Sequence, residues 1–169
     1  MRQIETSGFR TNSILGSLFV LCILLCSTVS NAQSAANYAG LWMLDTVKSD
    51  KFYKGIEVKY SITQTPQSFT VKQIFTIESS KESVINEDSY TLDGKVKIAE
   101  TENGKSNNSV KWSSDKKVLT TRSTIFYGTQ EVGYTETFSL SDNGLVLTVQ
   151  KSDINPEALS IKLVFNKKQ

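Results

Sequence analysis

Residues 117–152 read KVLTTRSTIFYGTQEVGYTETFSLSDNGLVLTVQKS, and this segment gives the clearest indication of the fold. Apolar and polar residues alternate along it, as they do in strands that bury one face. Two short turn motifs, Gly128-Thr129 and Asn143-Gly144, interrupt the alternation. Gly at the first turn position suits a type II′ turn, and Asn-Gly is the preferred type I′ pair, so each motif predicts a two-residue hairpin loop. The stretch therefore predicts three consecutive antiparallel strands.

With two-residue loops, the apolar residues of neighbouring strands lie on the same side of the sheet. A slip of one residue would move them to the other side, so the pattern is a sensitive test of register. The predicted cross-strand partners are Leu140 with Leu147, Phe138 with Val149, Ile125 with Val132 and Leu119 with Phe138. Both hairpins therefore agree on one buried face.

The same alternation extends from Ala39 towards the end of the chain, with turn-forming residues at intervals of about ten positions. That spacing is typical of an all-β sandwich or barrel, and no stretch has a helical period long enough to compete. We predict ten strands, at residues 39–45, 55–64, 69–78, 83–92, 95–102, 107–113, 117–127, 130–140, 145–152 and 158–166.

The remaining connections are also interpreted as antiparallel hairpins, which gives an up-and-down meander. Asp93-Gly94 and Asn103-Gly104 fit this scheme if each glycine takes the left-handed conformation of a bulged turn. Loops at residues 65–68 and 79–82, and a longer one around Asn155-Pro156, predict the pairs Ile62 with Val71, Val58 with Phe75, Val71 with Tyr90, Phe69 with Leu92, Leu147 with residues 161–163, and Leu145 with Phe165.

A meander of this size has one apolar face to bury and two edges to protect. Closing the sheet on itself does both. We therefore predict a closed, or nearly closed, antiparallel barrel, with an open sheet folded into a sandwich as the alternative. The positions predicted to face solvent are polar: Glu57, Lys59, Lys72, Lys95, Lys97, Glu131 and Lys162.

The first 32 residues have the features of an export signal. Arg2 and Arg10 precede the apolar run ILGSLFVLCILLC at residues 14–26, and small residues at positions 30–32 suit cleavage after Ala32. The apolar run is shorter than the ~20 residues that span a bilayer. We expect a signal peptide at 1–32 and one domain at 33–169, secreted or periplasmic, with no membrane span after cleavage; an uncleaved anchor is the alternative.

The composition of residues 33–169 excludes several classes of chemistry. The chain has no histidine, and both cysteines, Cys22 and Cys26, lie in the predicted signal peptide. The usual ligands for zinc and copper are therefore missing, as are Ser-His and Cys-His nucleophiles. Lys and Arg number 17 against 16 acidic residues, which gives no electrostatic reason to expect a nucleic-acid partner. We expect no metal site and no cofactor.

The first predicted strand carries a short motif. Residues 38–45 read YAGLWMLD, and Gly-x-Trp at the start of a β-meander resembles the opening strand of lipocalin-type (calycin) barrels. In that family the Trp plugs the closed end of the barrel and the Gly permits close packing there. The resemblance thus implies these roles for Trp42 and Gly40, and it implies a lipocalin-like barrel over residues 33–169. The resemblance is to small exported lipocalin-like domains, many of unknown role.

Two features depart from the family pattern. Lipocalins commonly place an arginine from a late strand over that Trp. Here the only arginine after the predicted cleavage site is Arg122, which the two-residue loop directs outward, opposite Thr135; a three-residue loop would turn it inward, opposite Glu136. Fatty-acid-binding barrels carry two helices between the first two strands, and the nine residues at 46–54 are too few for them.

The predicted inner face is mostly aliphatic and aromatic, but it includes a band of polar residues. The register places Tyr60, Gln73 and Asp88 opposite one another, Thr121 opposite Glu136, Glu136 opposite Lys151, and Ser123 opposite Tyr134. Such groups either orient a ligand in an apolar pocket or satisfy one another as a hydrogen-bonded network. The ligand-binding candidates on the inner face are Tyr60, Gln73, Asp88, Tyr90, Thr121, Ser123, Tyr134 and Glu136.

Three functions are compatible with this pattern. The first is an exported, monomeric lipocalin-like barrel that binds a small, mostly apolar molecule in its interior. The second is a non-enzymatic interaction or structural protein of the cell envelope, with a filled barrel, whose outer residues Ile74, Val118 and Phe126 bind another exported protein. The third is an enzyme that uses carboxylates or tyrosines, with Asp88 and Glu136 as the acid–base pair. The sequence contains no recognisable catalytic motif.

Overall fold

The computed structural model describes residues 34–50, 55–101, 104–155 and 160–169. The predicted signal peptide and its cleavage site lie outside these residues. Within the described ranges the chain is all-β and contains no helix capable of crossing a membrane. The ten strands are β1 (Gly40–Leu44), β2 (Ile56–Gln64), β3 (Ser68–Ile77), β4 (Ser83–Thr91), β5 (Lys97–Thr101), β6 (Gly104–Trp112), β7 (Val118–Tyr127), β8 (Gln130–Leu140), β9 (Val146–Asp153) and β10 (Ile161–Lys167).

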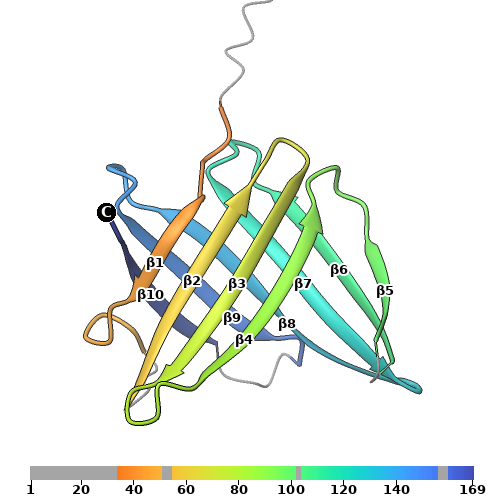
Figure 1. Ribbon diagram of the computed structural model, residues 1–169. Helices are drawn as coiled ribbons and strands as arrows, with labels where there is room; N and C mark the ends of the chain where they lie inside the picture. The colour runs from red at the N-terminus through yellow and green to blue at the C-terminus, as the bar shows by residue number, and fades with distance from the viewer. Residues whose placement is uncertain (1–33, 51–54, 102–103, 156–159) are drawn as a thin grey trace, which may run out of the picture. The chain divides into compact units, whose positions relative to one another are not determined.

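The strands form one antiparallel sheet that curls into a nearly closed barrel (Figure 1). Its order is β4-β3-β2-β1-β10-β9-β8-β7-β6-β5, so β1 and β10 close the meander and β4 and β5 are the two edges. The predicted barrel is confirmed, but the predicted hairpin between β4 and β5 is wrong. Figure 1 shows these two strands diverging from the loop that joins them. We call the opening between them the seam.

Residue chemistry explains why the barrel opens here. Between Val84 and Tyr90 the inner positions of β4 are Asn86 and Asp88, and β5 contributes Lys97 and Ala99. These four residues offer little apolar surface. Closing the seam would bury polar groups without a compensating apolar contact. The barrel therefore closes elsewhere, between β1 and β10, where Leu44 lies opposite Phe165.

The register agrees with the prediction at three hairpins, β2–β3, β7–β8 and β8–β9. The hairpin at Gly128-Thr129 has a two-residue loop with Gly128 at φ +62°, and it pairs Ile125 with Val132. The predicted pairs between β2 and β3 are also confirmed. The register predicted for β8 and β9 is correct, since Leu140 lies opposite Leu147.

The turn between β8 and β9 is nevertheless of a different type from the predicted I′ turn. Ser141 N donates to Val146 O, and Gly144 N donates to Ser141 O, so four residues form the loop and Gly144 alone has a positive φ, +69°. The side chain of Asn143 accepts hydrogen bonds from Ser141 Oγ and Leu145 N. These side-chain bonds stabilise a turn in which Asn143 need not adopt a positive φ.

Two predicted registers are wrong by two residues. Phe69 lies opposite Tyr90 instead of Leu92, and Phe165 lies opposite Leu147 instead of Leu145. Between β3 and β4 the loop is residues 78–81, one residue earlier than predicted, because Lys81 takes a left-handed conformation (φ 61°) and its N–H donates to Ile77 O. A shift of two residues leaves every side chain on its predicted face.

One end of the barrel is packed with aromatic side chains. Trp42 is fully buried, as predicted, and its Nε1 donates to Tyr38 O at 2.9 Å. The buried Tyr38 ring lies against Phe69, Phe138 and Trp112, and its hydroxyl is 2.7 Å from Lys117 O. The segment before β1 therefore crosses this end of the barrel and connects β1 to the β6–β7 turn.

Lys167, and not Arg122, lies over the Trp42 ring. Its Nζ is 5.1 Å from the ring centroid, and a Cβ on Gly40 would press against its side chain. Arg122 faces outward opposite Thr135, as predicted, and pairs with Glu131 at 3.1 Å. The flexible end of Lys167 could move away from such a Cβ, so the backbone φ of +144° is the stronger reason for glycine at position 40.

Candidate functional site

Glu136 on β8 is at the centre of a polar cluster inside the barrel. The residue is only 2% exposed, and its Oε1 lies 3.2 Å from Lys151 Nζ on the neighbouring β9. The same oxygen accepts from Tyr60 Oη at 3.3 Å and from Gln73 Nε2 at 3.4 Å, on β2 and β3. Burial raises the pKa of the Glu136 carboxyl, and Lys151 opposes that rise. These hydrogen-bonded side chains therefore reach across the interior of the barrel and fill it at the level of Glu136.

A second cross-barrel contact joins β8 to the seam. Tyr134 Oη donates to Asp88 Oδ2 at 2.6 Å. Burial raises the pKa of the Tyr134 hydroxyl, and the charge of Asp88 raises it further, so the phenol keeps its proton. Lys151 Nζ lies 3.6 Å from the centroid of the Tyr134 ring, which adds a cation–π contact to its ion pair with Glu136.

The other three candidates line the β4 and β7 walls. Thr121 Oγ1 donates to Glu136 O at 3.4 Å, and Ser123 Oγ donates to Asn108 Oδ1 at 2.9 Å. The hydroxyl of Tyr90, a residue 1% exposed, makes no hydrogen bond within the described part of the chain; it interacts only loosely with the Thr121 hydroxyl. A buried polar group without a partner is uncommon in folded proteins.

All eight candidates lie on the inner face, but two predicted placements are wrong. Gln73 lies opposite Asn86, so Asp88 faces Val71 instead. Lys97, predicted to face solvent, lies opposite Asn108 on the inner face of β5. The two-residue shift between β3 and β4 explains the first error, and the short β5 with its own register explains the second.

A cleft of about 340 Å³ follows the seam beside this cluster. Asp88, Ser123 and Asn108 line it, and the rim carries both charge types in Glu87 and Lys97. Asn108 and Lys97 were not among the predicted site residues. The signal for Asn108 was the run of non-apolar residues at 104–108 (GKSNN) opposite β5, which indicates an inner face too polar for a sealed core. We call this hollow the polar cleft.

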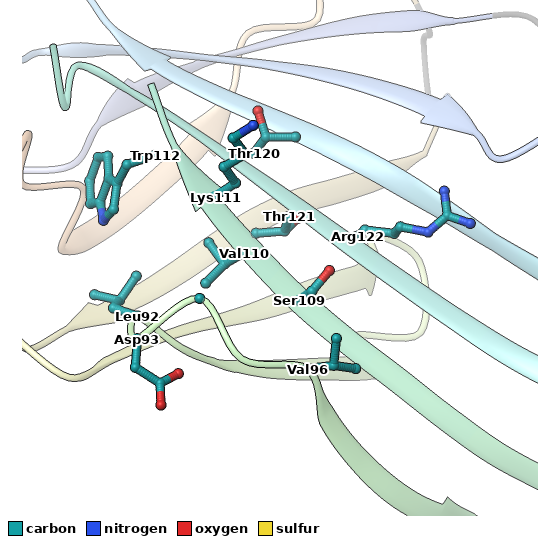
Figure 2. Close-up of a pocket in the computed structure, with 11 residues that line it drawn as sticks. Leu92, Asp93, Val96, Ser109, Val110, Lys111, Trp112, Thr120, Thr121 and Arg122 are labelled. Atoms are coloured by element: carbon teal, nitrogen blue, oxygen red, sulfur yellow. The ribbon is translucent and has the colours of Figure 1, made fainter. Parts of the chain in front are cut away.

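A second hollow, of about 580 Å³, lies where the β4–β5 loop moves away from the edge of β6 (Figure 2). Its apolar lining comes from Leu92, Val96, Val110 and Trp112, and we call it the apolar groove. Figure 2 shows Leu92 and Val96 on one side and Val110 and Thr121 on the other. The remaining lining residues are Asp93, Gly94, Ser109, Lys111, Thr120 and Arg122.

The two hollows follow one another along β6 and β7. Val110 lines the apolar groove, and Asn108, the next inner position of β6, lines the polar cleft. On β7, Thr121 lines the apolar groove, and Ser123, the next inner position, lines the polar cleft. An elongated molecule could therefore place an apolar part in one hollow and a polar end in the other.

The geometry gives no support to Asp88 and Glu136 as a catalytic pair. Each carboxylate is already held by other groups, Asp88 by Tyr134 and Glu136 by Lys151, Tyr60 and Gln73. Among the residues that the structure describes, no group of three or more acidic side chains could hold a metal ion.

Comparisons with known proteins show the fold of this chain and no family. No protein-family model matches the sequence, and no curated protein does. Among solved structures, a protein described as REP1-NXSQ fatty acid transporter is similar with a TM-score of 0.55 and 13% identity, over 80% of this chain and 98% of that one. Secretory abundant heat soluble protein 4 from Ramazzottius varieornatus is similar with a TM-score of 0.54 and 9% identity, over 82% and 100%. At such identities the likeness is one of barrel architecture.

Proposed function

We propose that this protein is an exported, lipocalin-like barrel that binds one small, mostly apolar molecule with a polar end. The observation that carries the proposal is that successive inner positions of β6 and β7 line first the apolar groove and then the polar cleft. Both volumes fall within the ~300–1,000 Å³ typical of ligand sites. The likeness of the fold to a protein described as a fatty acid transporter supports a barrel of this general use.

The ligand would lie along the seam and not in the centre of the barrel. The hydrogen bonds around Glu136 already occupy the middle of the interior, and aromatic rings fill the end near Trp42. The seam offers Val110 and Trp112 to an apolar chain, and Ser123, Asn108 and Asp88 to a polar end. Entry through the seam requires no opening of the β1–β10 closure.

Native mass spectrometry of gently purified protein tests this proposal. We expect an adduct of constant mass that disappears when Val110→Trp fills the apolar groove. Val118→Trp, on the outer phase of the neighbouring strand, is the matched control and should keep the adduct. An apo mass in the unchanged protein, with no shift after addition of apolar probes, would contradict the proposal.

A second candidate function rests on the outer face of β5–β7. Ile98, 65% exposed, and Phe126 line a surface hollow of about 620 Å³, which could receive a side chain of another exported protein. Of the three outer residues predicted to bind a partner, Ile74, Val118 and Phe126, the first lies on β3, on another part of the wall. The three residues therefore do not form one patch. Pull-down with Phe126→Lys tests this candidate, and unchanged recovery of the partner would exclude the hollow as its site.

A further inference from the structure

The charges that line the interior carry information about the polar end of the ligand. The inner positions at mid-barrel contribute Asp88, Glu136 and Lys151. Lys151 is occupied twice, by the Glu136 carboxylate at 3.2 Å and by the Tyr134 ring at 3.6 Å. An incoming anion would have to displace both contacts. Lys151, the cation among these mid-barrel positions, is therefore not free to receive a carboxylate.

Acceptors, in contrast, are available at the polar cleft. Asp88 uses one carboxylate oxygen to accept from Tyr134, and no other hydrogen bond to Asp88 occurs among the described residues. Asn108 Oδ1 accepts from Ser123, and Glu87, also in the lining, is on the outer phase of β4 and pairs with Lys72 at 3.8 Å. The buried Tyr90 hydroxyl, two residues along β4 from Asp88, has no hydrogen-bond partner in the described chain. Among the described residues, the second carboxylate oxygen of Asp88 is therefore the charged acceptor that a ligand can reach, with the Tyr90 hydroxyl behind it.

Lys97 is the cation in the polar cleft that would favour an anionic ligand instead. It lies on the lining of the polar cleft, but it is exposed on an edge strand and forms no ion pair with Asp88 in the described structure. A charge so placed is hydrated and screened, whereas Asp88 is half-buried beside Tyr134. We therefore expect Asp88, and not Lys97, to determine which polar end is bound.

We propose that the polar end of the ligand donates hydrogen bonds to Asp88, as an ammonium or hydroxyl group does, and that the site discriminates against carboxylates. This inference rests on the proposed ligand-binding function and specifies its ligand class. It separates this chain from a fatty-acid carrier, although the barrel resembles that of a fatty acid transporter. The tail of the ligand lies in the apolar groove, against Val110 and Trp112.

A series of probes with one tail and different head groups tests the inference. Dodecylamine, dodecanol and dodecanoate are titrated by isothermal calorimetry below their micellar concentrations. Because the Asp88 carboxylate attracts an ammonium group by its charge and repels a carboxylate, we expect dodecylamine to bind about tenfold more tightly than dodecanoate, with dodecanol between them. Tightest binding of dodecanoate would overturn the inference and leave the proposed function intact.

Isosteric variants identify the residue responsible. Asp88→Asn still accepts from Tyr134, and we expect it to weaken dodecylamine by about tenfold while changing dodecanol little. Lys97→Gln should leave both affinities unchanged; if it instead abolishes a preference for dodecanoate, the inference is wrong. Glu57→Gln, on the outer face of β2, is the control for net charge. If none of the three probes binds the unchanged protein, the proposed function itself fails.

Discussion

The aromatic end of the barrel and the seam obey the same alternating sequence pattern but bury it to different extents. At the aromatic end, inner residues such as Trp42 and Phe138 are fully buried. At the seam, Val84 is also an inner residue by register, yet it is 59% exposed. Alternation therefore determines which face a side chain takes, but burial depends on whether another wall packs against it. The predictions below test this contrast.

The largest effect is expected at the aromatic end. Trp42→Ala removes a fully buried indole and its hydrogen bond to Tyr38 O, so we expect a loss of about 3–5 kcal/mol in the free energy of unfolding. Val47→Ala, at a position 92% exposed, should change it by less than about 0.5 kcal/mol. Urea denaturation measures both. A loss below about 1 kcal/mol for Trp42→Ala would show that this end is not the main source of stability.

The second-largest loss of stability is expected when the ion pair between Lys151 and Glu136 is broken. Lys151→Met leaves the buried Glu136 carboxylate without its cation, so we expect a loss of about 2–3 kcal/mol at neutral pH. Lys151 is partly exposed, which keeps this value below that of a fully buried pair.

The same variant should also change the pH dependence of stability. Burial raises the folded-state pKa of Glu136 above its ordinary 4.5, so the folded state binds the extra proton and is stabilised at low pH. Stability then falls as the pH rises from 4.5 through the raised folded value. Without Lys151 that value rises further, and we expect a steeper loss that continues to higher pH. The double variant Lys151→Met/Glu136→Gln should abolish the additional slope; if the slope persists, another group causes it.

The sequence predicted a structural feature correctly where turn-forming residues within one turn determine it, and missed features that depend on a residue without a turn preference or on contacts between distant strands. The hairpin at Gly128-Thr129 was predicted correctly because glycine within the turn itself sets the register. The β3–β4 register was missed because Lys81, a residue with no turn preference of its own, takes the left-handed conformation. The seam was missed because it depends on how well two walls fit, which no single hairpin encodes.

For the candidate site, the sequence likewise predicted the features that follow from strand register and missed those that depend on closure of the barrel. The faces of all eight candidates followed from strand parity, and the pairs Glu136–Lys151 and Ser123–Tyr134 followed from the confirmed β7–β8–β9 register. The bond between Tyr60 and Glu136 joins residues 76 positions apart in the chain and depends on closure of the barrel, so alternation could not predict it. Tyr38 was missed as a core residue because it precedes the first strand and has no periodic neighbours.

A smaller effect distinguishes two tyrosines near the seam, Tyr134, which is half-buried, and Tyr90, which is buried. Tyr134→Phe removes the donor to Asp88, and we expect a loss of about 1–2 kcal/mol in the free energy of unfolding. Tyr90→Phe removes a hydroxyl that has no hydrogen-bond partner in the described chain, so we expect no loss or a gain of up to about 1 kcal/mol. Equal losses from both substitutions, measured by urea denaturation, would mean that Tyr90 has a partner such as bound water.

The smallest effect is expected on the outer face, at Arg122. Its ion pair with Glu131 is exposed to solvent, and such pairs contribute about 0–1 kcal/mol. Arg122→Ala should therefore change the free energy of unfolding by less than about 1 kcal/mol, and added salt should reduce the difference. Lys167→Ala, which uncovers the buried Trp42 ring, should cost more than Arg122→Ala and should change the Trp42 fluorescence. The reverse order of these two losses would mean that Arg122 contacts the core, against the outward register that places it opposite Thr135.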